Sequence, residues 1–235
     1  SEVNLLLQNK AMDKSVYPTF DIHNLVANKS ANDLLNADRF KSYLSSNPHL
    51  EVVHNHAFYH LVYFTEGSGE HVIDFVTFPV QKGMIYFMRP GQVHKWYFNE
   101  DPDGYIVNFS ATFFDQLFIN SNFLDRFPFF DQVAAHQVLI LKEDTQQQVE
   151  QFFEKILCEQ SEKQSSAQLM IATLLLQLFL TVERDDPKKI KEETAGYNSV
   201  ILRNFQQLIE DNFKTIRLPK GYAGLLYITP NHLNA

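Results

Sequence analysis

The chain has 235 residues, of which 45% are hydrophobic and 14% aromatic, with 21 phenylalanines. A chain of this size can bury a core and form one domain of ordinary size plus a smaller one. The single cysteine, Cys158, excludes an internal disulfide framework and is typical of a protein in the reducing cytoplasm.

The net charge of −8 is unevenly distributed along the chain. Residues 1–185 carry 13 Lys and Arg against 23 Asp and Glu, whereas residues 186–235 carry 7 against 5. An acidic body with a mildly basic tail allows contact with DNA through the tail alone.

The N-terminus lacks the basic start, apolar stretch and cleavage site of a signal peptide. The longest apolar run, Leu169–Val182, has 14 residues and contains Thr and Gln. A membrane-spanning helix needs about 20 residues, so this run predicts a buried or dimer-forming helix. We therefore expect a soluble, cytoplasmic protein that has no membrane partner.

Residues 1–50 hold a few strand-like pieces between polar turns and are expected to form a peripheral arm. From Val52 to Phe109, short β-branched and aromatic runs alternate with turn residues. Corners are expected at 67–69, 82–83, 89–91 and 101–104, where Gly or Pro occurs. Strands spaced in this way predict an antiparallel β-barrel or sandwich.

After Ala111 the apolar residues recur with a helical period. We predict a short Phe-rich helix at Thr112–Asn120, an amphipathic helix at Thr145–Lys163, and a helix at Ser166–Arg184 that is apolar on most of its surface. The last two helices, packed on the barrel and on a symmetry mate, would form the interface of a homodimer. A helical hairpin within one chain is the alternative.

The charged segment Asp185–Gly196 contains a proline and predicts a linker. Beyond it, Tyr197–Phe213 predicts an amphipathic helix, and Tyr222–Leu226 a short one. After a turn at 227–228, Thr229 is a suitable N-cap and Pro230 occupies the favoured first helical position. This order is the plan of a helix-turn-helix. An unrelated pair of short helices is the alternative.

The tail closely resembles the first helix-turn-helix of the AraC (arabinose-regulator) family. The matching residues are Tyr222, Ala223, Leu226, Ile228, Thr229, Pro230, Asn231 and Leu233. The resemblance implies that Thr229, Asn231 and His232 contact DNA. Family members continue through a second helix-turn-helix, whereas this sequence stops at Ala235. We therefore expect the full gene product to bind DNA and the 235-residue chain to bind it poorly.

A second resemblance covers the strand region. His54–His60, Gly67–Gly69, Gly83 and Pro90–Trp96 resemble the two motifs of cupin barrels, and the same run resembles the sensor half of AraC-type regulators. The resemblance implies an α+β fold: a cupin-like antiparallel β-barrel or sandwich, a helical pair, then the helices of a partial helix-turn-helix domain. We expect an effector-binding and dimerisation domain at 1–184, a linker at 185–196, and the truncated start of a DNA-binding domain at 197–235.

Alternate side chains of a strand share a face, so His54, His56, Phe58 and His60 are expected to point the same way. The resemblance to cupins implies that they point into the barrel, with His94 approaching from the facing strand. Metal-binding cupins keep a glutamate where His60 stands, and His54, His56, His60 and His94 are the candidate metal ligands. AraC-type sensors generally use these positions as a polar wall for an organic ligand. We therefore predict neither a metal nor another cofactor.

The predicted ligand contacts are His56, His60, His94, Phe58 and Trp96. A sugar or an aromatic acid would suit a mostly apolar pocket with a few polar groups. Trp96 could stack on a sugar ring, although a single Trp in a Phe-rich protein is more often part of the core.

Three classes of function compete: a ligand-responsive transcription regulator, a metal-dependent cupin enzyme, and a non-catalytic binding module. The enzyme hypothesis lacks the glutamate of the first cupin motif and leaves the tail unexplained. We predict a regulator that is not an enzyme, binds a small-molecule effector in its barrel, and contacts DNA through its C-terminal domain. The effector would shift an equilibrium between DNA-binding geometries.

Overall fold

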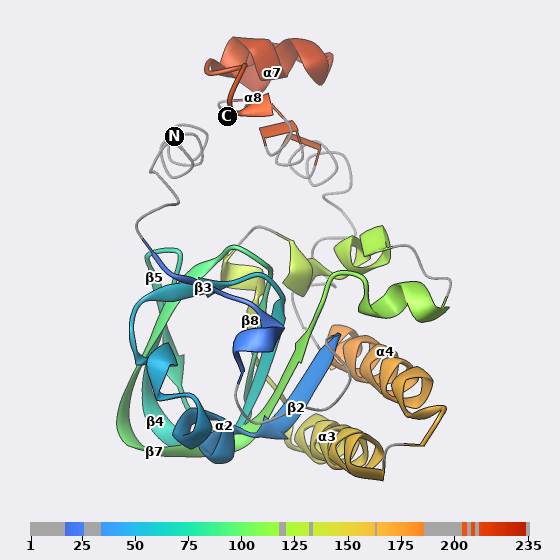
Figure 1. Ribbon diagram of the computed structural model, residues 1–235. Helices are drawn as coiled ribbons and strands as arrows, with labels where there is room; N and C mark the ends of the chain where they lie inside the picture. The colour runs from blue at the N-terminus through green and yellow to red at the C-terminus, as the bar shows by residue number, and fades with distance from the viewer. Residues whose placement is uncertain are drawn as a thin grey trace. The chain divides into compact units, whose positions relative to one another are not determined.

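In the computed structural model of the chain, two long antiparallel strands, β4 (Tyr59–Ile73) and β7 (Val93–Phe109), pair along most of their length (Figure 1). The structure describes residues 17–25, 34–117, 121–131, 134–162, 164–185, 204–205, 208–209 and 212–233. The chain divides into a larger unit, Tyr17–Pro187, and a smaller one that joins Ser1–Val16 to Lys188–Ala235. The predicted linker after Asp185 and most of the predicted helix 197–213 lie outside the described residues.

Within the described residues, eight strands form one sheet in the order β1-β3-β7-β4-β6-β8, with β2 beside β7 and β5 beside β4. Only the β1–β3 pair is parallel. The shorter strands are β1 (Thr19–Phe20), β2 (Leu35–Arg39), β3 (His54–His56), β5 (Val76–Val80), β6 (Met84–Met88) and β8 (Val138–Ile140). The prediction of a mostly antiparallel sheet is confirmed.

Two of the predicted corners are wrong, because the strands continue through them. β4 runs through residues 67–69 and β7 through 101–104, and the register between the two strands shifts between Phe64 and Gly69. Such β-bulges bend a strand without ending it. At Gly104 a Cβ atom would lie 1.9 Å from the Tyr63 carbonyl oxygen, so the backbones approach too closely there for any other residue.

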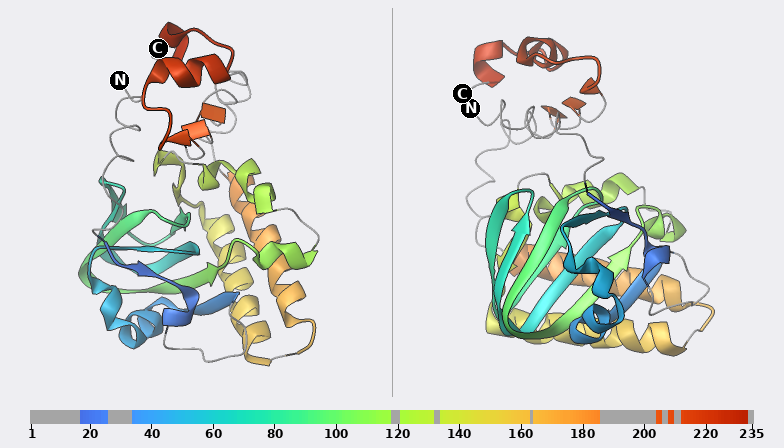
Figure 2. Two further views of the ribbon diagram at one scale, coloured as in Figure 1. Left: turned by 45° about the horizontal axis from the view of Figure 1, so that its top comes forward. Right: turned by 60° about the vertical axis from the view of Figure 1, so that its left-hand side comes forward.

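Because of the bends, β4 and β7 each contribute to two halves of the sheet. β6 pairs with residues 60–63 of β4, whereas β5 pairs with residues 69–73. As a result the sheet curves around an interior, which Figure 2 shows from two further directions. This interior holds the candidate site.

The two faces of the sheet belong to two separate cores. On β4, Leu61 and Tyr63 face the outer core, which the helices cover, whereas Val62 and Phe64 face the interior. β6 and β7 alternate in the same way. Because both faces are covered, the first half of β4 is an almost unbroken apolar run rather than an alternating one.

The helical pair α3 (Glu143–Glu162) and α4 (Ala167–Asp185) follows the sheet, within two residues of the predicted bounds at each end. Phe153 of α3 and Phe179 of α4 are buried in the outer core. The Phe-rich helix expected at 112–120 is instead a 3₁₀ helix, η4 (Phe113–Leu117). Further 3₁₀ helices are η5 (Ser121–Arg126), η6 (Pro128–Phe130) and η7 (Ala134–His136).

The predicted arm contains more regular structure than expected. η2 (Ile22–Asn24) begins at a capping box in which the Asp21 carboxylate accepts a hydrogen bond from the Asn24 amide and the Asp21 amide donates one to the Asn24 side chain. After β2 come α2 (Phe40–Ser46) and η3 (Pro48–Glu51). Phe40 and Tyr43 of α2 are buried in the interior core, so this segment closes part of the sheet rather than lying loosely on it.

Among the described helices, only α4 is long and apolar enough to cross a membrane, with a mean hydropathy of 1.3. Half of that stretch is buried inside the protein, and Leu175, Leu178 and Phe179 are buried in the outer core. A helix in the core of a folded domain packs in this way.

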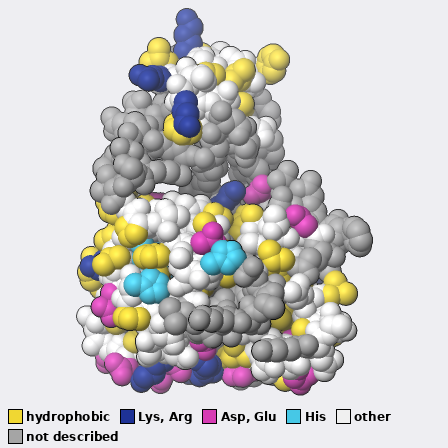
Figure 3. Space-filling model, in the orientation of Figure 1, with side chains coloured by type: hydrophobic (Ala, Val, Ile, Leu, Met, Phe, Trp, Pro, Cys, Tyr) yellow, Lys and Arg dark blue, Asp and Glu magenta, His cyan; other side chains and the backbone are white. Residues whose placement is uncertain are grey.

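In the smaller unit, α7 (Pro219–Leu225) and α8 (Pro230–Leu233) stand close to where two short helices were predicted. Tyr222 is fully buried with Phe205 and Ile209, and its hydroxyl donates a hydrogen bond to the Ile216 carbonyl. Residues 212–233 include two Lys and one Arg but no Asp or Glu, and Figure 3 shows positive side chains on one face of this unit.

Candidate functional site

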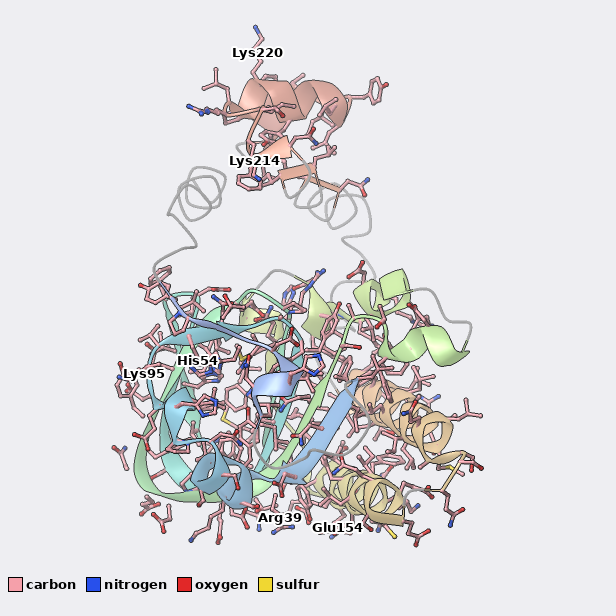
Figure 4. The ribbon with its side chains drawn as sticks, in the orientation of Figure 1. Arg39, His54, Lys95, Glu154, Lys214 and Lys220 are labelled. Atoms are coloured by element: carbon pink, nitrogen blue, oxygen red, sulfur yellow. The ribbon has the colours of Figure 1, made fainter. Side chains whose placement is uncertain are left out.

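The interior of the curved sheet contains a group of histidines. Of the residues that the structure describes, His54 and His56 on β3, His60 and His71 on β4, and His94 on β7 are each at most 2% exposed. β3 pairs with β7 so that His54 stands opposite His94. In Figure 4, His54 points into the space that the sheet surrounds. We call these five residues the histidine cluster.

Four of the rings form a continuous chain of contacts. The Nε2 atom of His56 lies 3.2 Å from Nε2 of His54 and 2.9 Å from Nε2 of His94. The Nδ1 atom of His94 lies 2.9 Å from Nε2 of His71. At the other end, Nδ1 of His54 lies 2.7 Å from the Val52 carbonyl oxygen.

His60 joins the cluster by stacking, with its ring 4.7 Å from that of His56 and tilted by 26°. Its Nδ1 atom lies 2.8 Å from Oδ1 of Asn108, a fully buried residue of β7. Since an amide oxygen only accepts hydrogen bonds, Nδ1 of His60 carries the proton. Its Nε2 atom therefore presents a lone pair.

Several buried polar atoms here make no hydrogen bond to any described residue. They are Nδ1 of His56 and His71, Nε2 of His60, and the amide nitrogen of Asn108. More than nine in ten buried polar groups in proteins are hydrogen-bonded, so four such atoms in one place are unusual. Each would gain a hydrogen bond from a polar molecule that reached it.

Aromatic rings line the cluster. Phe58 stacks on His56 with ring centres 4.4 Å apart. Trp96 stacks on His71 at 3.2 Å and is itself partly exposed. Tyr86 meets both His71 and Trp96 edge to face. The site thus combines flat apolar surfaces with a few polar atoms, as small-molecule pockets generally do.

Burial keeps the cluster uncharged at neutral pH. It lowers the pKa of His60 to about 3 and the pKa values of His56, His71 and His94 well below the ordinary value, with the neighbouring imidazoles adding to the effect. The pKa of His54 is lowered too, again chiefly by burial. Neutral imidazoles can both donate and accept hydrogen bonds and can bind metal ions.

The structure brings together most residues that sequence reasoning selected. His54, His56, His60, His94 and Phe58 lie in one buried group, and Trp96 reaches it through its stack on His71. One detail was wrong, because a bend at residues 57–58 separates β3 from β4, so these residues do not share one strand.

Two residues of the site were missed, His71 and Asn108. The signal for Asn108 was present, since it stands two residues after Ile106 on a strand whose even-numbered positions face the interior. His71 lies beyond the bulges of β4, which shift the alternation and hide which face it takes.

The candidate DNA contacts lie at the start of α8. The amide of Leu233 donates a hydrogen bond to the Thr229 carbonyl at 3.2 Å, which closes the first turn. The side chains of Asn231 and His232 lie outside what the structure describes. Their predicted role therefore stays a prediction.

Comparison with known proteins gives one match to a family. The profile of the AraC-like ligand binding domain matches residues 46–179, which is more than half of the chain. No curated protein sequence matches.

Two similar solved structures have low TM-scores. The AraC-like transcriptional activator CuxR is 10% identical, with a TM-score of 0.34, over 84% of this chain and 65% of that chain. An apo variant of ToxT from Vibrio cholerae is 11% identical, with a TM-score of 0.33. That match covers 85% of this chain and 72% of the ToxT chain. The chain thus spans slightly less than two thirds of CuxR.

Proposed function

Because the chain belongs to the AraC-like ligand-binding domain family, we propose that it is the effector-sensing part of a transcription regulator. In this proposal the curved sheet is a cupin-like barrel that takes up a small molecule. The helices α3 and α4 contribute to a homodimer, and residues 197–235 begin a helix-turn-helix domain that follows a linker at 185–196. The protein would act in the cytoplasm without contacting a membrane.

The observation that carries the sensing role is the set of unpaired buried polar atoms inside the sheet. Each costs free energy unless a partner satisfies it, so a molecule that supplies partners would bind favourably. The imidazoles of His56, His60 and His94 would contact its polar groups, and Phe58 and Trp96 its flat surfaces. A sugar or an aromatic acid has both features.

The proposal for DNA rests on the tail. Residues 212–233 carry Lys214, Arg217 and Lys220 without an acidic residue, in contrast to the acidic remainder of the chain. Lys and Arg bind DNA phosphates and release counterions. In the proposal, α8 is the start of the helix that enters the major groove, with Thr229, Asn231 and His232 near the bases.

A metal-dependent enzyme is the less well supported alternative. His54, His56 and His94 have ligand atoms close enough to share an ion. Among the described residues, no carboxylate belongs to this group. Hydrolytic and isomerising sites need a general acid or base whose pKa lies near the working pH, and burial moves the pKa values of His56, His60, His71 and His94 far below it. We therefore propose a non-catalytic role.

Trp96 provides the test of effector binding, because it is the only tryptophan in the chain and stacks on His71. Sugars and aromatic acids would be screened by tryptophan fluorescence and by thermal shift. We expect at least one compound to change both signals at one molecule per chain, and His60→Gln to weaken its binding at least tenfold.

The matched control for the screen is Phe75→Ala, in the exposed β4–β5 turn. This variant should bind as the wild-type chain does. A compound that binds equally well to the wild-type chain and to His60→Gln would place the binding site outside the interior and contradict the proposal.

A version of the chain extended past Ala235 tests the DNA role. Gel-shift titrations would use candidate operator fragments with and without the selected compound. A regulator must show different affinities in the two conditions, because an effector can act only through its different affinity for two states. Identical affinities would refute the regulatory coupling, while leaving effector binding intact.

A further inference from the structure

Three imidazoles of the histidine cluster converge on one point. One ring nitrogen from each of His54, His56 and His94 lies within 4.8 Å of the other two, and the two Nε2 contacts made by His56 measure 3.2 and 2.9 Å. All three rings are buried, at 1–2% exposure. Although the family resemblance led us to expect no metal, we propose that these three nitrogens bind a divalent transition-metal ion.

Proton positions give the first argument. Nδ1 of His54 donates to the Val52 carbonyl, which can only accept, so Nε2 of a neutral His54 presents a lone pair to the other two rings. If Nε2 of His56 carries a proton, it can donate a hydrogen bond to His54. It then has no lone pair to accept a hydrogen bond from His94. If Nε2 of His94 carries a proton instead, it can donate a hydrogen bond to an unprotonated Nε2 of His56. The lone pairs of His54 and His56 then face each other.

Every neutral arrangement therefore leaves at least one of the two contacts without a proton of its own. When Nε2 of His56 carries no proton, its lone pair faces another about 3 Å away and the two repel. When it carries one, a single N–H is shared between two acceptors. A cation placed among three lone pairs attracts all of them. A metal ion removes the conflict without requiring any ring to be charged, which burial opposes.

The distances give the second argument. A Zn–N bond is about 2.0–2.1 Å long, so nitrogens on neighbouring positions of one ion stand about 3.0–3.4 Å apart. Two of the three separations, 2.9 and 3.2 Å, are close to that range, and the third is within 4.8 Å. Imidazole ligands suit Zn²⁺, Cu²⁺, Fe²⁺ and Ni²⁺ rather than the oxygen-seeking Mg²⁺ and Ca²⁺.

The surroundings give the third argument. Metal-binding histidines almost always hydrogen-bond through their other ring nitrogen, which fixes the ring. The Val52 carbonyl holds His54 in this way. His71 does so for His94, at 2.9 Å. His71 is therefore a positioning residue, and three protein ligands leave an open position on the ion for a water or an effector atom.

The test uses the full 235-residue chain without a polyhistidine tag, first stripped of metal with a chelator. Zn²⁺ would be titrated by calorimetry, and Co²⁺ by its visible absorption, which reports coordination directly. We expect one ion per chain, a raised melting temperature with Zn²⁺, and a Co²⁺ spectrum typical of nitrogen ligands. His54→Gln, His56→Gln and His94→Gln should each weaken binding about 100-fold.

His71→Gln should weaken binding less, by about tenfold, because the amide oxygen can still accept from His94. His23→Gln and His136→Gln, which change histidines outside the cluster, should bind as the wild-type chain does. If a ligand variant fails to fold, the Co²⁺ spectrum and metal content of the wild-type chain still decide.

Binding with less than one ion per chain, or binding that survives all three ligand substitutions, would overturn the metal site. This test does not depend on the proposed sensing role, because effector binding is measured separately by Trp96 fluorescence in the presence of chelator.

Discussion

Acid should unfold this protein through its buried histidines, and His60 allows the effect to be calculated. Its pKa is about 3 in the folded chain, against 6.5 for an ordinary histidine, because burial opposes the charged ring. Between these values the unfolded chain binds a proton that the folded chain does not. The free energy of unfolding therefore falls as the pH drops below 6.5.

The size of the effect follows from the two pKa values. Between pH 7.5 and pH 5.0, His60 alone should lower the free energy of unfolding by about 2 kcal/mol. The other four histidines of the cluster act in the same direction, since burial lowers their pKa values too. A loss of this size is a large part of the stability of a typical domain.

The assay is urea unfolding followed by circular dichroism at both pH values, with chelator present. The variant His60→Gln keeps a donor for Asn108 but cannot titrate, so its loss between pH 7.5 and 5.0 should be smaller than that of the wild-type chain by about 2 kcal/mol. His23→Gln, at an exposed position, serves as the control. Equal losses in His60→Gln and the wild-type chain would refute the reasoning.

Three further substitutions, two of them paired with a control, test the fold and the tail. Gly104→Ala should lower the melting temperature markedly, because the new Cβ would lie 1.9 Å from a carbonyl oxygen of the neighbouring strand, whereas Gly224→Ala, which meets nothing within 4 Å, should be tolerated. Phe179→Ala should cost about 3–5 kcal/mol in urea unfolding, and Leu169→Ala, on the exposed side of the same helix, under about 1 kcal/mol. In the chain extended past Ala235, Lys220→Ala should weaken binding to all DNA sequences alike and reduce the salt slope by about one; an unchanged slope would exclude a phosphate contact.

The helical pair could be predicted from the sequence because its apolar residues recur with a helical period over nearly 20 positions. The bends of the long strands could not. Glycines at 67 and 69 look the same in a sequence whether they end a strand or form a bulge within it. The structure shows that they belong to a bulged strand, and the register shifts decide the matter.

The candidate site was predictable where the alternation of a strand is regular. His54 and His56 share a face by that rule, and the rule also reaches Asn108. It fails for His71, which lies past the bulges. The tautomers of His54 and His94 depend on a carbonyl and a ring supplied by other residues, Val52 and His71. Such contacts follow from the folded structure and not from spacing.

The central claim is that a small molecule binds among the imidazoles inside the curved sheet. The most direct measurement is nuclear magnetic resonance of the chain with ¹⁵N-labelled histidines, before and after addition of a compound selected by Trp96 fluorescence. The account predicts that the ring nitrogens of His56, His60 and His94 shift, while those of His23 and His136 stay unchanged. Unchanged signals from the cluster in the presence of a saturating compound would contradict it.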